Sequence, residues 1–164
     1  MELLWLLLGL FSLVALVVVW QKGRLAEANR APIPYRKKPT LLSPAERSFY
    51  GALQRVAGEA YRVQVKVRLA DLIQPASGLS RSDWRRAFNR IAQKHVDFVL
   101  VKPSTFEVVC AIELDDASHA QEERKRRGGF VEEALRSAGL PLIRVPAKSG
   151  YTLQEVRAWL GWEA

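Results

Sequence analysis

The chain has few of the residues that form covalent scaffolds. Its 164 residues include one cysteine, Cys110, so no disulfide can form within one chain and the compartment need not be oxidising. Cys110 lies inside an apolar run, where we expect a small core residue. The sequence also lacks a glycine-rich phosphate loop, an internal repeat and a low-complexity tract, and it has two histidines. The acidic residues are therefore the most informative part of the sequence.

The N-terminus lacks two features of a cleaved signal peptide. Glu2 stands where basic residues would precede the apolar run at residues 3–20, and no small-x-small cleavage site follows that run. As a helix rising about 1.5 Å per residue, the run spans about 27 Å, enough to cross a bilayer core. We therefore expect residues 1–21 to form an uncleaved, single-pass transmembrane anchor that contacts the membrane through residues 3–20.

Positive charge gathers directly after this run. Residues 22–40 read as a basic, proline-containing linker, and residues 21–40 hold six basic residues against one acid, a net charge of +5. Positive residues that flank a span stay on the cytoplasmic side. The N-terminus is therefore expected outside and the domain in the cytoplasm, at the inner membrane. Because this segment can also bind anionic lipid headgroups, the whole-chain charge of +8 is a weak argument for nucleic acid.

Residues 41–164 have the size of one domain, and their patterns predict an α/β fold. Ser43 and Glu46 match a capping box that opens a helix, and Thr152 with Glu155 matches a second one. Apolar and polar residues alternate over 61–67, which predicts a strand with one solvated face. The expected order is helix, strand, helix, strand, strand, helix, strand, helix. A flexible break at residues 128–129 is expected before the third helix.

Two apolar runs carry acids. Residues 95–101 contain Asp97, residues 108–116 contain Glu113 and Asp115, and a turn-like segment between the runs predicts a β-hairpin. Burying an isolated carboxylate costs several kcal/mol, so a metal, a cation or water must compensate it. Asp97, Glu113 and Asp115 are the oxygen donors that Mg²⁺ or Mn²⁺ requires, so we expect them to bind the metal.

His119 follows the acids after a short turn. A neutral imidazole there could accept a proton from water or orient a ligand. The alternative is a solvated loop histidine, which is the commoner case. His95, at the entry of the Asp97 strand, has no stronger claim.

The pattern of residues 96–98, followed by residues 111–116 with His119 close behind, resembles the PD-(D/E)xK or restriction-endonuclease-like superfamily. More narrowly, residues 41–156 resemble an uncharacterised domain family, DUF2726, that is similar to very-short-patch repair endonucleases. The resemblance implies a mixed central sheet flanked by helices. It also implies that Glu46 joins Asp97 and Glu113 in the site, although the capping box alone explains Glu46 equally well.

The chain departs from the superfamily motif at its lysine. The motif lysine, which stabilises the attacking water or the phosphate, stands two residues after the acid, and here that position is Asp115. Lys94 and Lys125 are the candidate substitutes, with Arg127 as a further one.

Two basic groups flank the acids and could contact a phosphate backbone. The residues expected to do so are Arg85, Arg86, Arg90, Arg124 and Arg127. The alternative is a pair of solvated helix faces, with Trp84 and Phe88 in the core.

Together these features predict a membrane-anchored, Mg²⁺-dependent, nuclease-like domain that acts on phosphodiester bonds of DNA or, as a second choice, RNA. The expected catalytic set is Glu46, Asp97, Glu113, Asp115, His119, Lys94 and Lys125. Whether the domain is an enzyme stays open. The missing motif lysine favours an inactive nucleic-acid- or protein-binding module of the same fold, and the acids could instead form a structural salt-bridge cluster with neighbouring arginines.

Overall fold

The computed structural model describes residues 2–28, 33–115 and 121–162, and the side chains of residues 121–128 and of several residues in the N-terminal helix lie outside this description. The chain divides into two compact units, Met1–Pro39 and Thr40–Ala164. The first unit holds helix α1 (Glu2–Ala28), which contains the predicted span of residues 3–20. Within the described part of the chain, no helix has both the length and the apolar character needed to cross a membrane.

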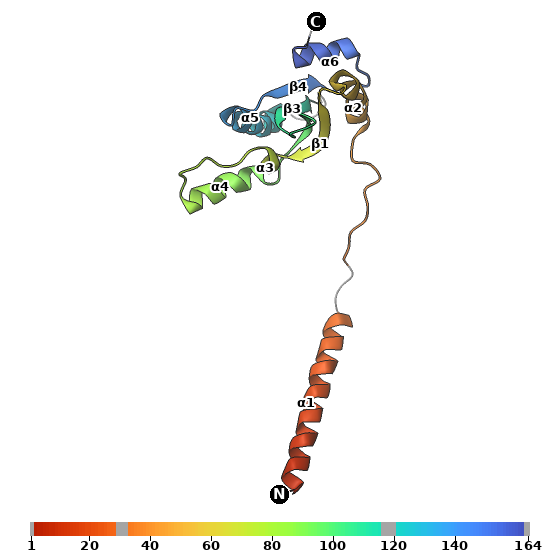
Figure 1. Ribbon diagram of the computed structural model, residues 1–164, viewed down its shortest axis with the longest axis vertical. Helices are drawn as coiled ribbons and strands as arrows, with labels where there is room; N and C mark the ends of the chain where they lie inside the picture. The colour runs from red at the N-terminus through yellow and green to blue at the C-terminus, as the bar shows by residue number, and fades with distance from the viewer. Residues whose placement is uncertain (1, 29–32, 116–120, 163–164) are drawn as a thin grey trace. The chain divides into compact units, whose positions relative to one another are not determined.

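The second unit is built on a four-stranded mixed sheet (Figure 1). Its strands follow the chain order β1-β2-β3-β4, with bounds Arg62–Arg68, His95–Val101, Val108–Asp115 and Leu142–Pro146. The β1–β2 and β2–β3 pairs are antiparallel, which confirms the predicted hairpin of the two acidic runs. The β3–β4 pair is parallel, and helix α5 (Gln121–Ser137) provides the crossover that a parallel pair requires.

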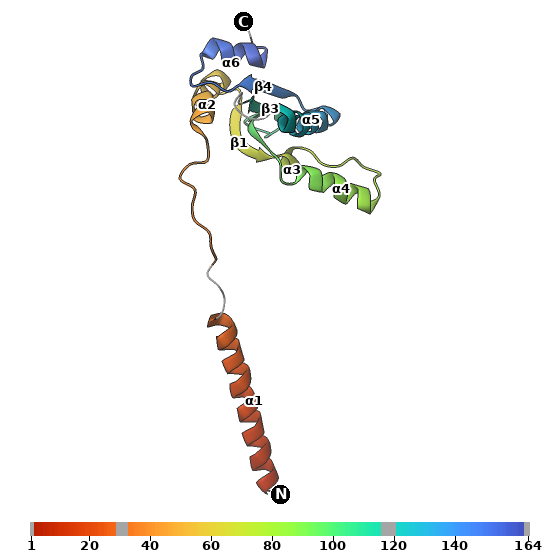
Figure 2. The ribbon, with the colours of Figure 1, turned by 180° about the vertical axis from the view of Figure 1, so that it is seen from behind.

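Helices cover both faces of this sheet (Figures 1 and 2). Helix α2 (Pro44–Ala57) and helix α6 (Leu153–Leu160) lie side by side, and a core that includes Phe49, Phe98 and Val156 joins them to the strands. On the other face, Leu135 of α5 packs in a second core with Val99 and other residues of the strands. The predicted mixed α/β fold with a helix-flanked sheet is confirmed.

Both predicted capping boxes are present, and they fix where α2 and α6 begin. The Ser43 hydroxyl accepts a hydrogen bond from the Glu46 N–H, and the Glu46 carboxylate accepts one of 2.7 Å from the Ser43 N–H. Thr152 and Glu155 make the same reciprocal pair at α6. Each box satisfies two backbone donors that a helix start leaves without partners.

The structure differs from the sequence expectations at three places. No break occurs at residues 128–129, because α5 runs continuously through both glycines. A four-residue helix, α3 (Leu69–Leu72), follows β1 directly and is absent from the expected order of elements. Trp84, on helix α4 (Arg81–Ile91), is 43% exposed and so does not lie in the core.

Leu53 tests the packing between α2 and the sheet. Its side chain is fully buried in the core that holds Phe49 and Phe98. We expect Leu53→Ala to lower the free energy of unfolding by about 2–5 kcal/mol, because the substitution removes apolar contacts and leaves a cavity. The matched control is Leu41→Ala at a 67% exposed position, which should change stability by less than about 0.5 kcal/mol. Urea denaturation followed by tryptophan fluorescence measures both, and equal stability of the two variants would contradict this packing.

Candidate functional site

A lysine that the motif comparison did not single out lies between two of the predicted acids. The Nζ atom of Lys66, on β1, is 2.6 Å from Oε1 of Glu46 and 2.8 Å from Oδ1 of Asp97. The three side chains are 29%, 16% and 22% exposed, so they are half-buried and yet open to solvent on one side. Lys66 is therefore a cation shared by a helix and a neighbouring strand.

The backbone at Lys66 is irregular. Its φ is +53°, a left-handed value that is uncommon for a residue with a side chain. On a regular strand Val65 and Val67 would lie on one face, but Val65 packs against the α2–α6 core and Val67 against the α5 core. Lys66 and Asp97 thus lie at the level where β1 and β2 exchange the faces they bury. Unusual backbone of this kind gathers at functional sites in proteins.

Glu46 reaches the site because its helix cap orients it. One carboxylate oxygen, Oε2, accepts the Ser43 N–H, and the other, Oε1, accepts the ammonium of Lys66. From the sequence, Glu46 could either cap its helix or join the site. In the structure its carboxylate caps the helix and also contacts Lys66.

Asp97 also uses both of its oxygens. Oδ1 accepts from Lys66, and Oδ2 accepts a 3.0 Å hydrogen bond from the backbone N–H of Leu114 on β3. The β2–β3 pairing runs as far as Phe98 with Ile112, next to Asp97 and Glu113. The negative charge of Asp97 contributes to raising the pKa of Glu113, so the carboxylates of these adjacent strands lie within electrostatic reach of each other.

Glu113 and Asp115 share a second cation, Arg144 of β4. The Nη1 atom of Arg144 is 2.7 Å from Oδ1 of Asp115 and 3.5 Å from Oε2 of Glu113, and its Nε is 3.6 Å from Oε2 of Glu132. The parallel pairing of Glu113 with Arg144 brings the guanidinium to this position. Glu113 and Asp115 are two residues apart on β3, which places them on the same face of a regular strand. Their shared contact with Arg144 agrees with that placement.

These surroundings shift the pKa values of the two acids Glu113 and Glu46 in opposite directions. Burial raises the pKa of Glu113, Arg144 partly offsets it, and the negative charges of Asp97 and Asp115 add to the rise. Burial also acts to raise the pKa of Glu46, but hydrogen bonds from Lys66 and Ser43 outweigh it, so that pKa is lowered. Burial acts to lower the pKa of Lys66, and its bonds to Asp97 and Glu46 reverse this, leaving that pKa raised. Lys66 is therefore cationic at neutral pH.

The acids of the site suit a metal ion with fewer protein ligands than the three that the sequence predicted. Among the described residues, no three His, Cys, Asp or Glu side chains form a group that could hold a metal ion. Asp115 is engaged by Arg144 and is 53% exposed, which makes it the weakest of the three predicted ligands. Asp97 and Glu113 supply two carboxylates from adjacent strands, and Mg²⁺ usually takes one or two from a protein and fills its other positions with water and substrate phosphate. The chemistry of this pair fits such an ion.

The other predicted site residues fall elsewhere. Nζ of Lys94 lies 5.5 Å from the ring centre of Phe130, so Lys94 is not the lysine that joins the acids. Arg85 and Arg86 stand on the exposed side of α4, and Arg90 of that helix lies over the Phe130 ring. The remaining predictions lie outside the described side chains: His119, Arg124, Lys125 and Arg127.

Sequence reasoning missed Lys66 and Arg144 as members of the site. Lys66 follows the apolar and polar alternation of residues 61–67, where it resembles any solvated lysine. Its partners are 20 and 31 residues away, so no local spacing reports the contact. Arg144 is likewise 29 residues from Asp115.

Removing the Lys66 ammonium should change the titration of Glu46. We expect Lys66→Met to raise the pKa of Glu46, because burial persists while the lysine's hydrogen bond and charge are lost. Carboxyl ¹³C NMR across a pH series measures this shift. Lys102→Met, which breaks an exposed ion pair with Glu107, is the control and should leave the Glu46 titration in place. An unchanged Glu46 pKa in Lys66→Met would contradict the shared cation.

Comparison with known proteins gives a family for this domain. Residues 38–163 match the model of a family described as a protein of unknown function, DUF2726. No curated protein and no solved structure matches the chain. The match spans almost the whole second unit, including every residue of the site described above, and the chain therefore belongs to the DUF2726 family.

Proposed function

We propose that this chain is a metal-dependent, nuclease-like phosphodiesterase with a restriction-endonuclease-like core. The observation that carries the proposal is the position of Lys66, whose ammonium bridges Glu46 and Asp97 close to the half-buried carboxylate of Glu113. Two acids and a lysine are the groups that the superfamily motif combines. Here the lysine comes from β1 instead of following Glu113 along β3.

Each residue has a definite part in this proposal. Asp97 and Glu113 would hold Mg²⁺ or Mn²⁺, which when bound supplies a Lewis acid and an activated water. Lys66, kept cationic by its two carboxylate partners, offers a fixed positive charge to a phosphate oxygen on which charge develops. Glu46 holds Lys66 in place. The expected role of His119 as a base or water-orienting group remains part of the proposal.

Arg144 supports a second candidate function. Its guanidinium contacts Glu113, Asp115 and Glu132, so the acids of β3 already have a cationic partner. A site neutralised in this way suits an inactive module of the same fold that binds nucleic acid or a protein. The first proposal requires that a metal at Asp97 and Glu113 compete with this guanidinium.

The cellular setting is proposed from the sequence. Residues 3–20 would contact the inner membrane as a single-pass anchor, with the N-terminus outside and Thr40–Ala164 in the cytoplasm. DNA is the preferred substrate class and RNA the second.

The test is cleavage by the full chain in non-ionic detergent. With Mg²⁺ or Mn²⁺ we expect nicking of plasmid DNA, its loss in EDTA, and a fall of at least about 100-fold in Asp97→Ala, Glu113→Ala and Lys66→Ala, because each removes a metal ligand or a charge-stabilising group. Lys102→Ala, which removes an exposed lysine paired with Glu107, is the matched control and should cleave at the wild-type rate.

Two outcomes would contradict the proposal. Cleavage at the wild-type rate in Glu113→Ala would show that the hydrolysis arises elsewhere. Calorimetry that detects no Mg²⁺ uptake dependent on Asp97, together with an absence of cleavage, would favour the inactive module.

A further inference from the structure

Helix α4 is weakly attached to the rest of the domain. In both ribbon views it extends away from the sheet beside α3 (Figures 1 and 2). Along α4, which the structure describes in full, Ile91 in the last turn is the single buried residue. Most of the surface of α4 is therefore exposed and accessible to a partner.

The exposed face of α4 presents a flat aromatic surface. The rings of Trp84 and Phe88 stack with centroids 5.1 Å apart and planes within 8° of parallel. The two residues are one helical turn apart, and Trp84 is 43% exposed. Because Phe88 supports one side of the indole, the other side is held in a fixed orientation toward solvent.

Arginines surround this aromatic pair. Helix α4 carries four arginines and one acid, Asp83, for a net charge of +3. Asp83 is bonded to Arg86, so within the described residues the exposed Arg81 and Arg85 have no anionic partner. A cluster of unpaired guanidinium groups complements a polyanion and disfavours a basic or purely apolar partner.

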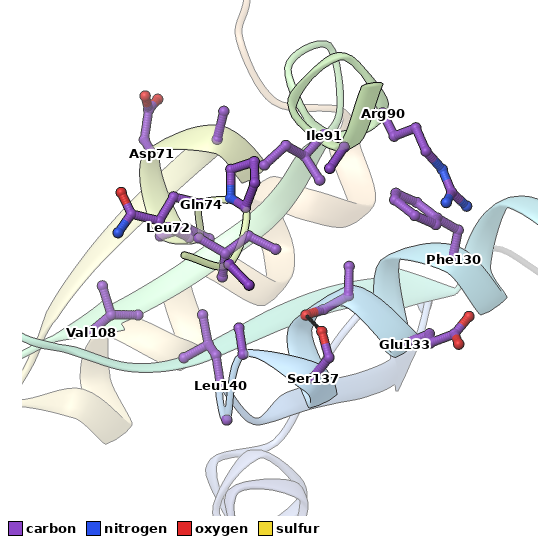
Figure 3. Close-up of a pocket in the computed structure, with 18 of the residues that line it drawn as sticks. Asp71, Leu72, Gln74, Arg90, Ile91, Val108, Phe130, Glu133, Ser137 and Leu140 are labelled. Atoms are coloured by element: carbon purple, nitrogen blue, oxygen red, sulfur yellow. Dashed lines mark hydrogen bonds between the residues drawn. The ribbon is translucent and has the colours of Figure 1, made fainter. Parts of the chain in front are cut away.

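A cavity of about 1060 Å³ opens between α3, α4 and α5, and its lining on α4 is Ala87, Arg90 and Ile91 (Figure 3). At its edge, the guanidinium of Arg90 lies 4.1 Å from the ring centre of Phe130, and Glu133 stands on the same helix as Phe130 (Figure 3). Arg90 is six residues after Trp84, so at about 3.6 residues per turn it projects from a different side of α4 than the aromatic pair. The cavity is therefore separate from the face that carries Trp84.

We propose that the exposed face of α4 forms a binding surface for single-stranded nucleic acid, with an unpaired base stacked on Trp84 and phosphates held by Arg81 and Arg85. The inference rests on the proposed function and names its substrate class. Aromatic faces interleaved with arginines are the elements by which proteins bind single strands. A duplex keeps its base faces inside the helical stack, so an exposed indole gains little from it.

The experiment measures binding without cleavage. The full chain in non-ionic detergent and EDTA is titrated into a fluorescein-labelled oligothymidylate of about 20 nucleotides, and into a duplex of the same length, by fluorescence anisotropy. We expect tighter binding of the single strand. Trp84→Leu should weaken that binding about tenfold, and Trp84→Phe should restore most of it, because stacking requires a π face and not merely apolar bulk.

A charge series tests the arginines separately. Arg81→Ala with Arg85→Ala should reduce the slope of log affinity against log salt by about 1.4, which corresponds to two phosphate contacts on a single strand. Arg55→Ala with Arg157→Ala, which removes two exposed arginines from α2 and α6, is the matched control and should leave the slope in place. Thermal unfolding of each variant checks that the fold is kept.

The outcomes separate this inference from the proposed function. Equal affinity for single strand and duplex, or unchanged binding in Trp84→Leu, would overturn it, even if plasmid cleavage were observed. Single-strand binding that depends on Trp84 supports it, and if no metal condition gave cleavage, that binding would stand while the phosphodiesterase proposal failed.

Discussion

The structure of this domain depends on one charge arrangement, the ammonium of Lys66 held between the carboxylates of Glu46 and Asp97. It ties the first turn of α2 to β1 and β2, and Asp97 extends the connection to β3 through the Leu114 N–H. The same contact lies where β1 and β2 change the faces that they bury. Without the lysine, the partly desolvated carboxylates of Glu46 and Asp97 would repel each other, so the position of each acid requires the cation.

Charge balance also explains how one small sheet can hold so many acids. Lys66 offsets the Glu46 and Asp97 pair, and Arg144 offsets Glu113 and Asp115 from the opposite side. Glu113 is the least well compensated of the four, because it is half-buried and lies 3.5 Å from its guanidinium while other carboxylates surround it. A half-buried acid with a distant partner is the one that gains most from an additional cation, which is why the proposed chemistry centres on Glu113.

Much of the fold could be predicted because its signals are local. The capping boxes at Ser43 and Thr152, the alternation of β1 and the apolar runs of β2 and β3 all involve residues within a few positions of one another. The errors have local causes too. The Gly128–Gly129 pair suggests a break, but the crossover between two parallel strands favours a continuous helix. Trp84 and Phe88 suggest a core by their apolar character, and yet they stack on each other on an exposed helix.

The sequence by itself determined helices α2, α4 and α6, the acidic hairpin and the placement of Asp97 and Glu113 on adjacent strands, because capping boxes, hydrophobic periodicity and turn residues are local signals. Tertiary structure alone decided which cations join them. The sequence alone does not distinguish Lys66, Lys94 and Arg144, since each is a basic residue that could neutralise an acid. Folding brings Lys66 and Arg144 to the carboxylates and leaves Lys94 on the Phe130 ring. The reason is that ion pairs form through space, over separations of 20 to 31 residues for these cations, so their partners are set by strand order and twist.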